Sequence, residues 1–194
     1  MMETLINITI QDILTKREDI LPFFLRKKSK FEGWLKFELA LSIESGLKMD
    51  NVEVETKNEH NKCRCDISFS FKDVIYRIEL KTSNTNWKTP GVISSRKGIS
   101  KNIKSIINDA KKLNCPNGIV SFVLFPIPLN NDSWKKYIKR ISEETEIHID
   151  ESHCTLLEVN VDAQNKCNLL ICSFRSKNYT EKVQMAAVNS DFAQ

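Results

Sequence analysis

Two carboxylates and a lysine lie close together in a stretch of the sequence that alternates apolar and polar residues. The run from Asp66 to Lys81 also contains Glu79, and its alternation breaks only near Lys72 and Asp73, which predicts a β-hairpin. Because side chains alternate between the two faces of a strand, Glu79 and Lys81 should share a face, with Asp66 on the adjoining strand. Such a group could hold a divalent cation beside a phosphate, which points to phosphodiester hydrolysis.

The surrounding sequence predicts the elements that must position this hairpin. We expect helices and strands in this order: a helix over residues 31–46 ending at Gly46, a strand over 52–56, the hairpin, a helix over 99–113, a strand over 118–128, a helix beginning at Asp132 or Ser133, and strands over 155–161 and 168–174. The strand over 118–128 is almost continuously apolar, as in a sheet covered on both faces. An earlier helix should stop or kink at Pro22. This order predicts an α/β fold with a central mixed sheet flanked by helices.

The helix over residues 99–113 has a clear apolar stripe. Helical spacing places five apolar residues inside, namely Ile99, Ile103, Ile106, Ile107 and Ala110. It places Lys101, Lys104, Asp109 and Lys111 outside. From Lys88 to Lys112 the sequence has seven basic residues against one acidic residue, so this segment could contact a polyanion.

Glu38 is the unusual residue of the helix over 31–46. It falls within the apolar sector that includes Trp34 and Leu35, whereas Glu32 and Glu44 do not. A carboxylate directed at a core is costly unless a cation or a donor compensates it, so we expect Glu38 to be functional. The alternative is a slightly rotated helix on which Glu38 reaches solvent.

With these residues in place, the chain resembles the PD-(D/E)xK nuclease superfamily, which includes restriction endonucleases and Holliday junction resolvases. The resemblance covers residues 31–128, and its motif would be carried by Glu38, Asp66 and Glu79-Leu80-Lys81. Cys65 stands where the motif has proline. A second glutamate-x-lysine tripeptide, beginning at Glu55, precedes a polar turn and has no aspartate on an adjoining strand.

The resemblance implies a restriction endonuclease-like fold with an αβββαβ core, and a metal-dependent endonuclease that cuts double-stranded DNA to leave a 5′-phosphate and a 3′-hydroxyl. Mg²⁺, with Mn²⁺ as a substitute, would be held by Asp66, Glu79 and the Leu80 carbonyl. Glu38 would complete the site directly or through water, and Lys81 would orient or help deprotonate the attacking water. Many relatives dimerise, so a homodimer is possible.

Nucleic-acid contacts are expected on the basic segment and on the loop that precedes it. Backbone phosphates would meet Arg96, Lys97, Lys101 and Lys104. Trp87 could stack on a base or enter a groove, although a partly packed loop aromatic is the slightly favoured interpretation. Branched DNA, single strands and RNA remain alternative substrates.

Three other interpretations stay open. The first is an ordinary hairpin whose polar residues form a solvated face with a cross-strand ion pair. The second is a catalytically silent nucleic-acid-binding or assembly module that keeps the nuclease fold. The third is an interaction domain without a nucleic-acid role, which salt-dependent DNA binding would exclude.

Composition sets broad limits on the protein. The 194 residues are 41% hydrophobic and carry a formal net charge of +4, which suits a single domain over residues 1–194 with a mild preference for polyanions. The sequence shows neither a signal peptide nor a membrane-length apolar run, so we expect a cytoplasmic protein without membrane contact. Six cysteines without a secretory signal predict reduced thiols, with structural zinc a weak alternative.

Overall fold

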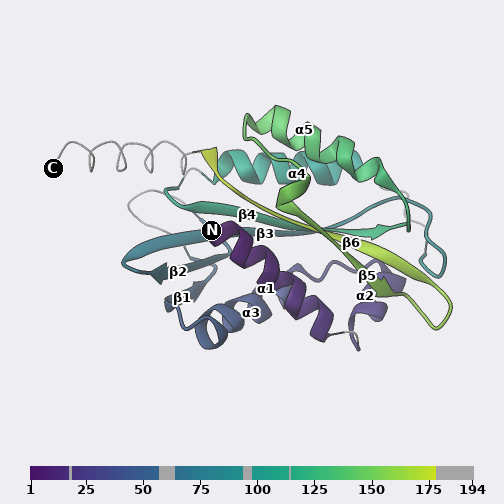
Figure 1. The fold of residues 1–194 in the computed structure, drawn as a ribbon, viewed down its shortest axis with the longest axis horizontal. Coiled ribbons are helices and arrows are strands. Elements are labelled where there is room, and N and C mark those ends of the chain that lie inside the picture. Colours follow the sequence, from purple (N-terminus) through teal and green to yellow (C-terminus); the bar gives the residue numbers. More distant parts are fainter. Residues whose placement is uncertain (18, 57–63, 94–97, 114, 178–194) are drawn as a thin grey trace.

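The chain forms a six-stranded mixed sheet in a computed structural model that describes residues 1–17, 19–56, 64–93, 98–113 and 115–177 (Figure 1). Its strands lie in the order β1-β2-β3-β4-β6-β5. Their bounds are Asp50–Val54 for β1, Ile67–Phe71 for β2, Val74–Asn84 for β3, Gly118–Ile127 for β4, Cys154–Asn160 for β5 and Lys166–Arg175 for β6. β3 and β4 run parallel, and the other neighbouring pairs are antiparallel.

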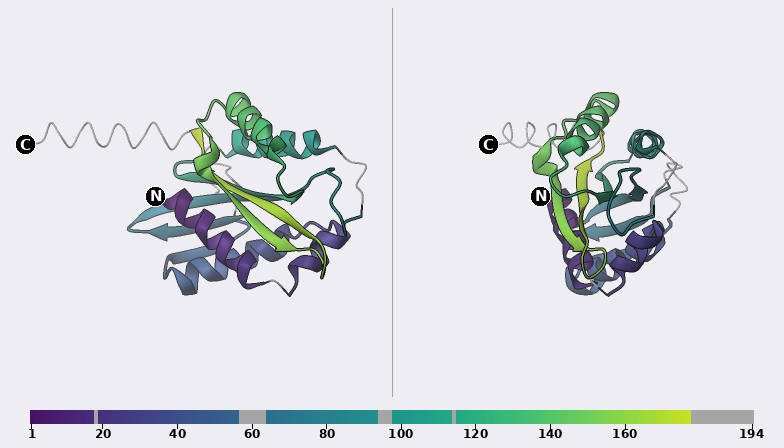
Figure 2. Two further views of the ribbon diagram at one scale, coloured as in Figure 1. Left: turned by 45° about the vertical axis from the view of Figure 1, so that its right-hand side comes forward. Right: turned by 90° about the vertical axis from the view of Figure 1, so that its right-hand side faces the viewer.

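Helices cover both faces of this sheet (Figures 1 and 2). One face carries α1 (Met2–Lys16), α2 (Leu21–Lys27) and α3 (Glu32–Leu41), and the other carries α4 (Ile99–Lys112) and α5 (Lys135–Thr145). Each helical layer encloses its own apolar cluster against the sheet. β4 is buried along its whole length between the two layers, as its continuous apolar sequence predicts. The expected α/β class with a mixed sheet between helices is confirmed.

The predicted hairpin is present, and its turn explains the position of the break in alternation. Lys72 and Asp73 adopt φ values of 49° and 63°, the left-handed pair that a tight two-residue hairpin turn requires. β2 pairs with β3 from Phe71 opposite Val74 to Ile67 opposite Ile78. Because β3 extends to Asn84, its second half continues past the end of β2.

The helices agree with the sequence pattern in most respects. All five residues of the expected α4 stripe are buried. The first helix ends at Lys16, and Pro22 lies in the first turn of α2, where its missing N–H needs no partner. α3 continues into a π-helical turn, Ser42–Gly46, that ends at the expected glycine. Short 3₁₀ turns at Asp132–Trp134 and Glu151–His153 precede α5 and β5.

Four of the described cysteines meet the expectation of reduced thiols, and one does not. Cys65, Cys154, Cys167 and Cys172 are free thiols, but Cys115 is disulfide-bonded, so the expectation of reduced thiols is wrong for that residue. In the part of the chain that the structure describes, no helix is long and apolar enough to cross a membrane.

Candidate active site

The candidate site lies where β3 extends beyond β2. No other strand of the described part of the chain pairs with the backbone amides of β3 on that side. Two carboxylates accept hydrogen bonds from these amides instead. Asp66 Oδ2 accepts from Leu80 N at 2.9 Å, and Glu32 Oε2 accepts from Thr82 N at 3.0 Å. Thr82 Oγ1 in turn accepts from Phe31 N at 3.2 Å, which ties the start of α3 to this part of β3. The strand extension therefore fixes both carboxylates by hydrogen bonds to main-chain groups.

A cavity of about 530 Å³ opens beside this extension. Two of the residues that the hairpin motif singled out, Asp66 and Glu79, line it together with Asp109 of α4. The remaining lining residues are Lys36, Glu55, Arg64, Cys65, Lys112 and Leu113. The structure thus brings four acidic side chains, those of Glu55, Asp66, Glu79 and Asp109, to a single concave surface.

Glu79 is electrostatically the most perturbed member of this group. Burial raises the pKa of its carboxyl to about 7, and the negative charges of Asp66 and Asp109 add to the effect against the opposing influence of Lys81. Glu79 is only half-buried, and Asp66 and Asp109, whose charges act on it, line the same cavity. A carboxyl in this state would gain from a further positive charge beside it.

Lys81 lies next to this cavity and is held by two other acids. Its Nζ lies 3.2 Å from Asp109 Oδ2 and 3.7 Å from Glu32 Oε1, and its side chain is only 19% exposed. Burial alone would lower the pKa of Lys81, but the charges of Glu32 and Asp109 raise it above its ordinary value. Lys81 is therefore a fixed cation at neutral pH. The interpretation of a solvated hairpin face does not fit a lysine and a glutamate enclosed in this way.

Asp109 was expected on the outer side of its helix, and that expectation is wrong. Its side chain is 15% exposed and pairs with Lys81. Asp109 follows Ile106 by three positions and adjoins Ala110, so it stands at the border of the apolar stripe, where helical spacing assigns no definite side. The proximity of Lys81 on β3 decides the direction.

Lys36 is a site residue that the sequence did not indicate. It is buried on α3, and its Nζ donates hydrogen bonds to Glu55 Oε1 at 2.8 Å and Asp66 Oδ1 at 3.1 Å. Burial alone would lower the pKa of Lys36, but these two hydrogen bonds raise it. The sequence feature that could have identified Lys36 is its spacing of one helical turn from Glu32, which places both residues on the same side of α3. A protonated lysine thus occupies part of the environment of Asp66.

Glu38 lies apart from this group. Its Oε1 accepts hydrogen bonds from Arg17 Nη1 at 3.0 Å and from Trp34 Nε1 at 3.1 Å. It lines a different cavity, of about 520 Å³, between α1 and the end of α3. The compensating cation that the sequence argument required exists, but it belongs to the end of α1. Helical spacing predicted the direction of the Glu38 side chain but could not show which element lies there. The glutamate of α3 that contacts β3 is Glu32.

The expected nucleic-acid contacts are only partly described. Lys101 and Lys104 are exposed on α4, whereas Arg96 and Lys97 lie outside the described residues. Trp87 packs against Tyr137, with 6.0 Å between ring centroids, in accordance with the interpretation of a partly packed aromatic. Lys112, at the end of α4, lines the cavity itself.

The described residues do not present a ready set of metal ligands. No group of three His, Cys, Asp or Glu side chains among them is arranged to hold a metal ion. Leu80 contributes its amide hydrogen to Asp66, and the role of its carbonyl as a ligand stays a prediction. Comparisons of the chain with family models, with curated proteins and with solved structures give no match.

Proposed function

We propose that this chain hydrolyses phosphodiester bonds of nucleic acid with the help of a divalent cation, and that double-stranded DNA is its first candidate substrate. The observation that supports this proposal is that Asp66, directly before β2, and Glu79 of β3 line one cavity, with the fixed cation of Lys81 beside it. The order α3-β1-β2-β3-α4-β4 agrees with the order of the nuclease core that the sequence resembles.

The oxygen donors on the cavity are of the kind that a hard cation such as Mg²⁺ or Mn²⁺ binds. Asp66 and Glu79 supply carboxylate oxygens, and Asp109 lines the same cavity. Burial and the charges of Asp66 and Asp109 raise the pKa of Glu79, and a bound cation would favour its ionised form. When bound, the cation would activate water near neutral pH and reduce the repulsion between this water and the anionic phosphodiester.

Lys81 would act through its charge. Because Glu32 and Asp109 keep it protonated, it is suited to stabilise negative charge on a phosphate and unsuited to remove a proton from water. Asp109 and Glu32 would be its positioning residues, since each holds its ammonium group on one side. Arg64 and Lys112, also on the cavity, are placed to attract the phosphate backbone.

A silent nucleic-acid-binding module is the second candidate, and one observation favours it. Lys36 already supplies a positive charge to Asp66, with an ammonium-to-carboxylate distance of 3.1 Å. In such a module this internal ion pair would replace the cation permanently. The two candidates predict the same salt-sensitive binding and differ only in metal-dependent turnover.

The test is a cleavage assay on supercoiled plasmid, linear duplex, single-stranded DNA and RNA, with Mg²⁺ or Mn²⁺ against EDTA. Lys81→Ala and Glu79→Ala should each reduce metal-dependent cutting at least about 100-fold while circular dichroism shows an intact fold. Lys166→Ala is the matched control, because Lys166 pairs with Glu158 at the exposed edge of the sheet and should leave cutting unchanged.

The outcomes separate the two candidates. Cutting that requires the metal and is lost in the site variants alone supports the nuclease. Salt-sensitive binding without cutting on any substrate supports the silent module. Cutting that survives in folded Lys81→Ala protein would refute the assignment of this site.

A further inference from the structure

Two cysteines lie directly opposite each other on β5 and β6, the last two strands at one edge of the sheet. Cys154, at the start of β5, pairs with Cys172 of β6 in the antiparallel ladder. Both are free thiols. Opposed residues of an antiparallel pair project to the same face, and both cysteines contact the apolar cluster beneath α4 and α5.

The hydrogen-bond pattern of the ladder shows how closely the two residues approach. Val161 N donates to Asn165 O at 2.8 Å, so the pair of Val161 and Asn165 is hydrogen-bonded. Hydrogen-bonded and non-hydrogen-bonded pairs alternate, and Cys154 lies an odd number of positions from Val161 without a register shift between them. The hydrogen bonds of β6 agree with this assignment. Ser176 N donates to Gly118 O on β4, so Cys172, four positions earlier, also directs its main-chain groups toward β4 and away from β5.

Cys154 and Cys172 therefore form a non-hydrogen-bonded pair, the closer of the two kinds. Cα atoms in such pairs are about 4.5 Å apart, within the range that a disulfide bridges. Cys167, the other cysteine of β6, faces the opposite apolar cluster and lies opposite Val159. The sheet thus selects Cys172 as the single cross-strand partner of Cys154.

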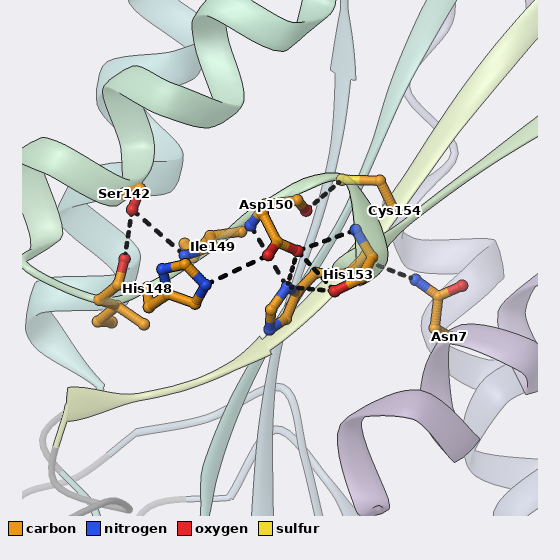
Figure 3. Close-up of polar contacts among 9 residues, drawn as sticks. Asn7, Ser142, His148, Ile149, Asp150, His153 and Cys154 are labelled. Atoms are coloured by element: carbon orange, nitrogen blue, oxygen red, sulfur yellow. Dashed lines mark hydrogen bonds and ion pairs between the residues drawn. The ribbon is translucent and has the colours of Figure 1, made fainter.

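The two thiols differ in their access to solvent. Cys172 is fully buried, and burial together with a hydrogen bond to Cys154 raises the pKa of its thiol well above the ordinary value. Cys154 is partly exposed and its Sγ contacts Asp150 O at 3.6 Å (Figure 3). The turn around it is held by Asp150, which pairs with His148 at 3.2 Å and with His153 at 3.0 Å. An oxidant in solution can reach Cys154 but not Cys172.

We propose that Cys154 and Cys172 are a redox-active pair that forms a reversible cross-strand disulfide when the protein meets a peroxide. The Cys154 sulfur attacks one peroxide oxygen, so that an S–O bond forms, the O–O bond breaks and water leaves. The Cys172 sulfur then attacks the sulfenic sulfur of Cys154, the S–S bond forms, and a second water carries away the hydroxyl. Two thiols are oxidised, and one hydrogen peroxide is reduced to two waters. A dithiol reductant reverses the change by thiol–disulfide exchange.

The cross-link would join the edge strand to the interior of the sheet. Within the described residues, β5 pairs with a strand on one side only, with β6, and α1 packs on its face. Asn7 of α1 donates to His153 O at 3.1 Å (Figure 3). It also accepts from Thr155 Oγ1 at 3.0 Å, so the segment around Cys154 already anchors the first helix. The disulfide should therefore oppose the fraying of β5 and α1. It should raise the midpoint of thermal unfolding of the oxidised protein by about 5 °C relative to the reduced protein.

The experiment oxidises the full chain with a small excess of hydrogen peroxide, blocks remaining thiols with an alkylating reagent and analyses tryptic peptides without reductant. Trypsin cuts after Arg140, Lys166 and Arg175, so Cys154 falls in the peptide 141–166, and Cys167 and Cys172 fall in the peptide 167–175. The linked pair of these two peptides should appear after oxidation and disappear after treatment with dithiothreitol.

Three variants identify the bond. Cys167→Ser is the matched control, since it removes the other thiol of the same peptide and should leave the linked product unchanged. Cys154→Ser should abolish the product. Cys172→Ala should abolish it as well and leave a sulfenic acid on Cys154 that dimedone labels. Because Cys154→Ser changes a partly exposed residue, it tests the bond even if the variant of the buried Cys172 does not fold.

Several results would overturn the proposal. One is a linked product that persists in Cys154→Ser protein, and another is a product that disappears in Cys167→Ser protein. Equal alkylation of Cys154 before and after peroxide treatment of the wild-type chain would overturn it too.

Discussion

Glu79→Gln should change how the stability of the metal-free protein depends on pH. In the folded state the pKa of Glu79 is about 7, against 4.5 for an unperturbed glutamate, so the folded protein retains a proton that the unfolded chain releases. The stabilisation from this proton is fully present below pH 4.5 and is lost as the pH rises to about 7. The full pKa difference corresponds to about 3.4 kcal/mol, and solvent screening at this half-buried position reduces it to about 1.5–2 kcal/mol. Glutamine cannot ionise, so the variant should not lose this contribution.

The assay is urea unfolding of both proteins in EDTA between pH 4 and pH 8.5. The free energy of unfolding of the variant, relative to wild type, should rise by about 1.5–2 kcal/mol across this range. Glu158→Gln, at the exposed edge of β5, is the matched control and should follow wild type. Parallel curves for wild type and Glu79→Gln would refute the reasoning, because they would mean that Glu79 ionises in the folded protein as easily as in the unfolded chain.

Magnesium gives this prediction a second readout that does not depend on cleavage. If Glu79 contributes a ligand, Mg²⁺ should stabilise wild type more at pH 8 than at pH 5, because only the ionised carboxylate attracts the cation. The same addition should have little effect on Glu79→Gln at either pH. Equal stabilisation of the two proteins at pH 8 would remove Glu79 from the proposed ligand set.

Two further predictions follow from the ion pairs around the site. Lys36→Met should lower the free energy of unfolding of the metal-free protein by about 2 kcal/mol, because Asp66 loses a charged hydrogen bond. In thermal unfolding, Mg²⁺ should stabilise this variant more than it stabilises wild type. Equal stabilisation of the two proteins would contradict competition between the lysine and the cation. Glu38→Gln should cost no more than about 1 kcal/mol in urea unfolding, because its pair with Arg17 is partly exposed. It should leave cleavage at the wild-type rate, whereas a loss as large as that of Lys81→Ala would place Glu38 in the catalytic machinery.

The sequence alone determined the local elements of this protein. The two-residue period on either side of Lys72 and Asp73 gave the hairpin, and the helical period gave the buried stripe of α4. The continuous apolar run gave β4 as a strand covered on both faces. These properties depend on neighbours within a few positions of each other, so periodicity and turn chemistry contain the information needed to find them.

Only the tertiary structure decided which side chains meet at the candidate site. The spacing of Glu38 gives an angle around the axis of α3, but the packing of α1 against α3 determines that Arg17 lies in that direction. In the same way, β2 begins only at Ile67 and so leaves the amide of Leu80 to Asp66, and the position of α4 turns Asp109 toward Lys81.

The pairing of Cys154 with Cys172 has the same origin. It depends on the register of β5 against β6. A shift of β5 by one residue would turn Cys154 to the other face of the sheet, opposite a different residue of β6. Hydrophobic periodicity assigns a residue to a face of its own element. Contacts between elements distant in sequence also depend on how long each element is and on how it packs, and the assembled fold alone fixes both.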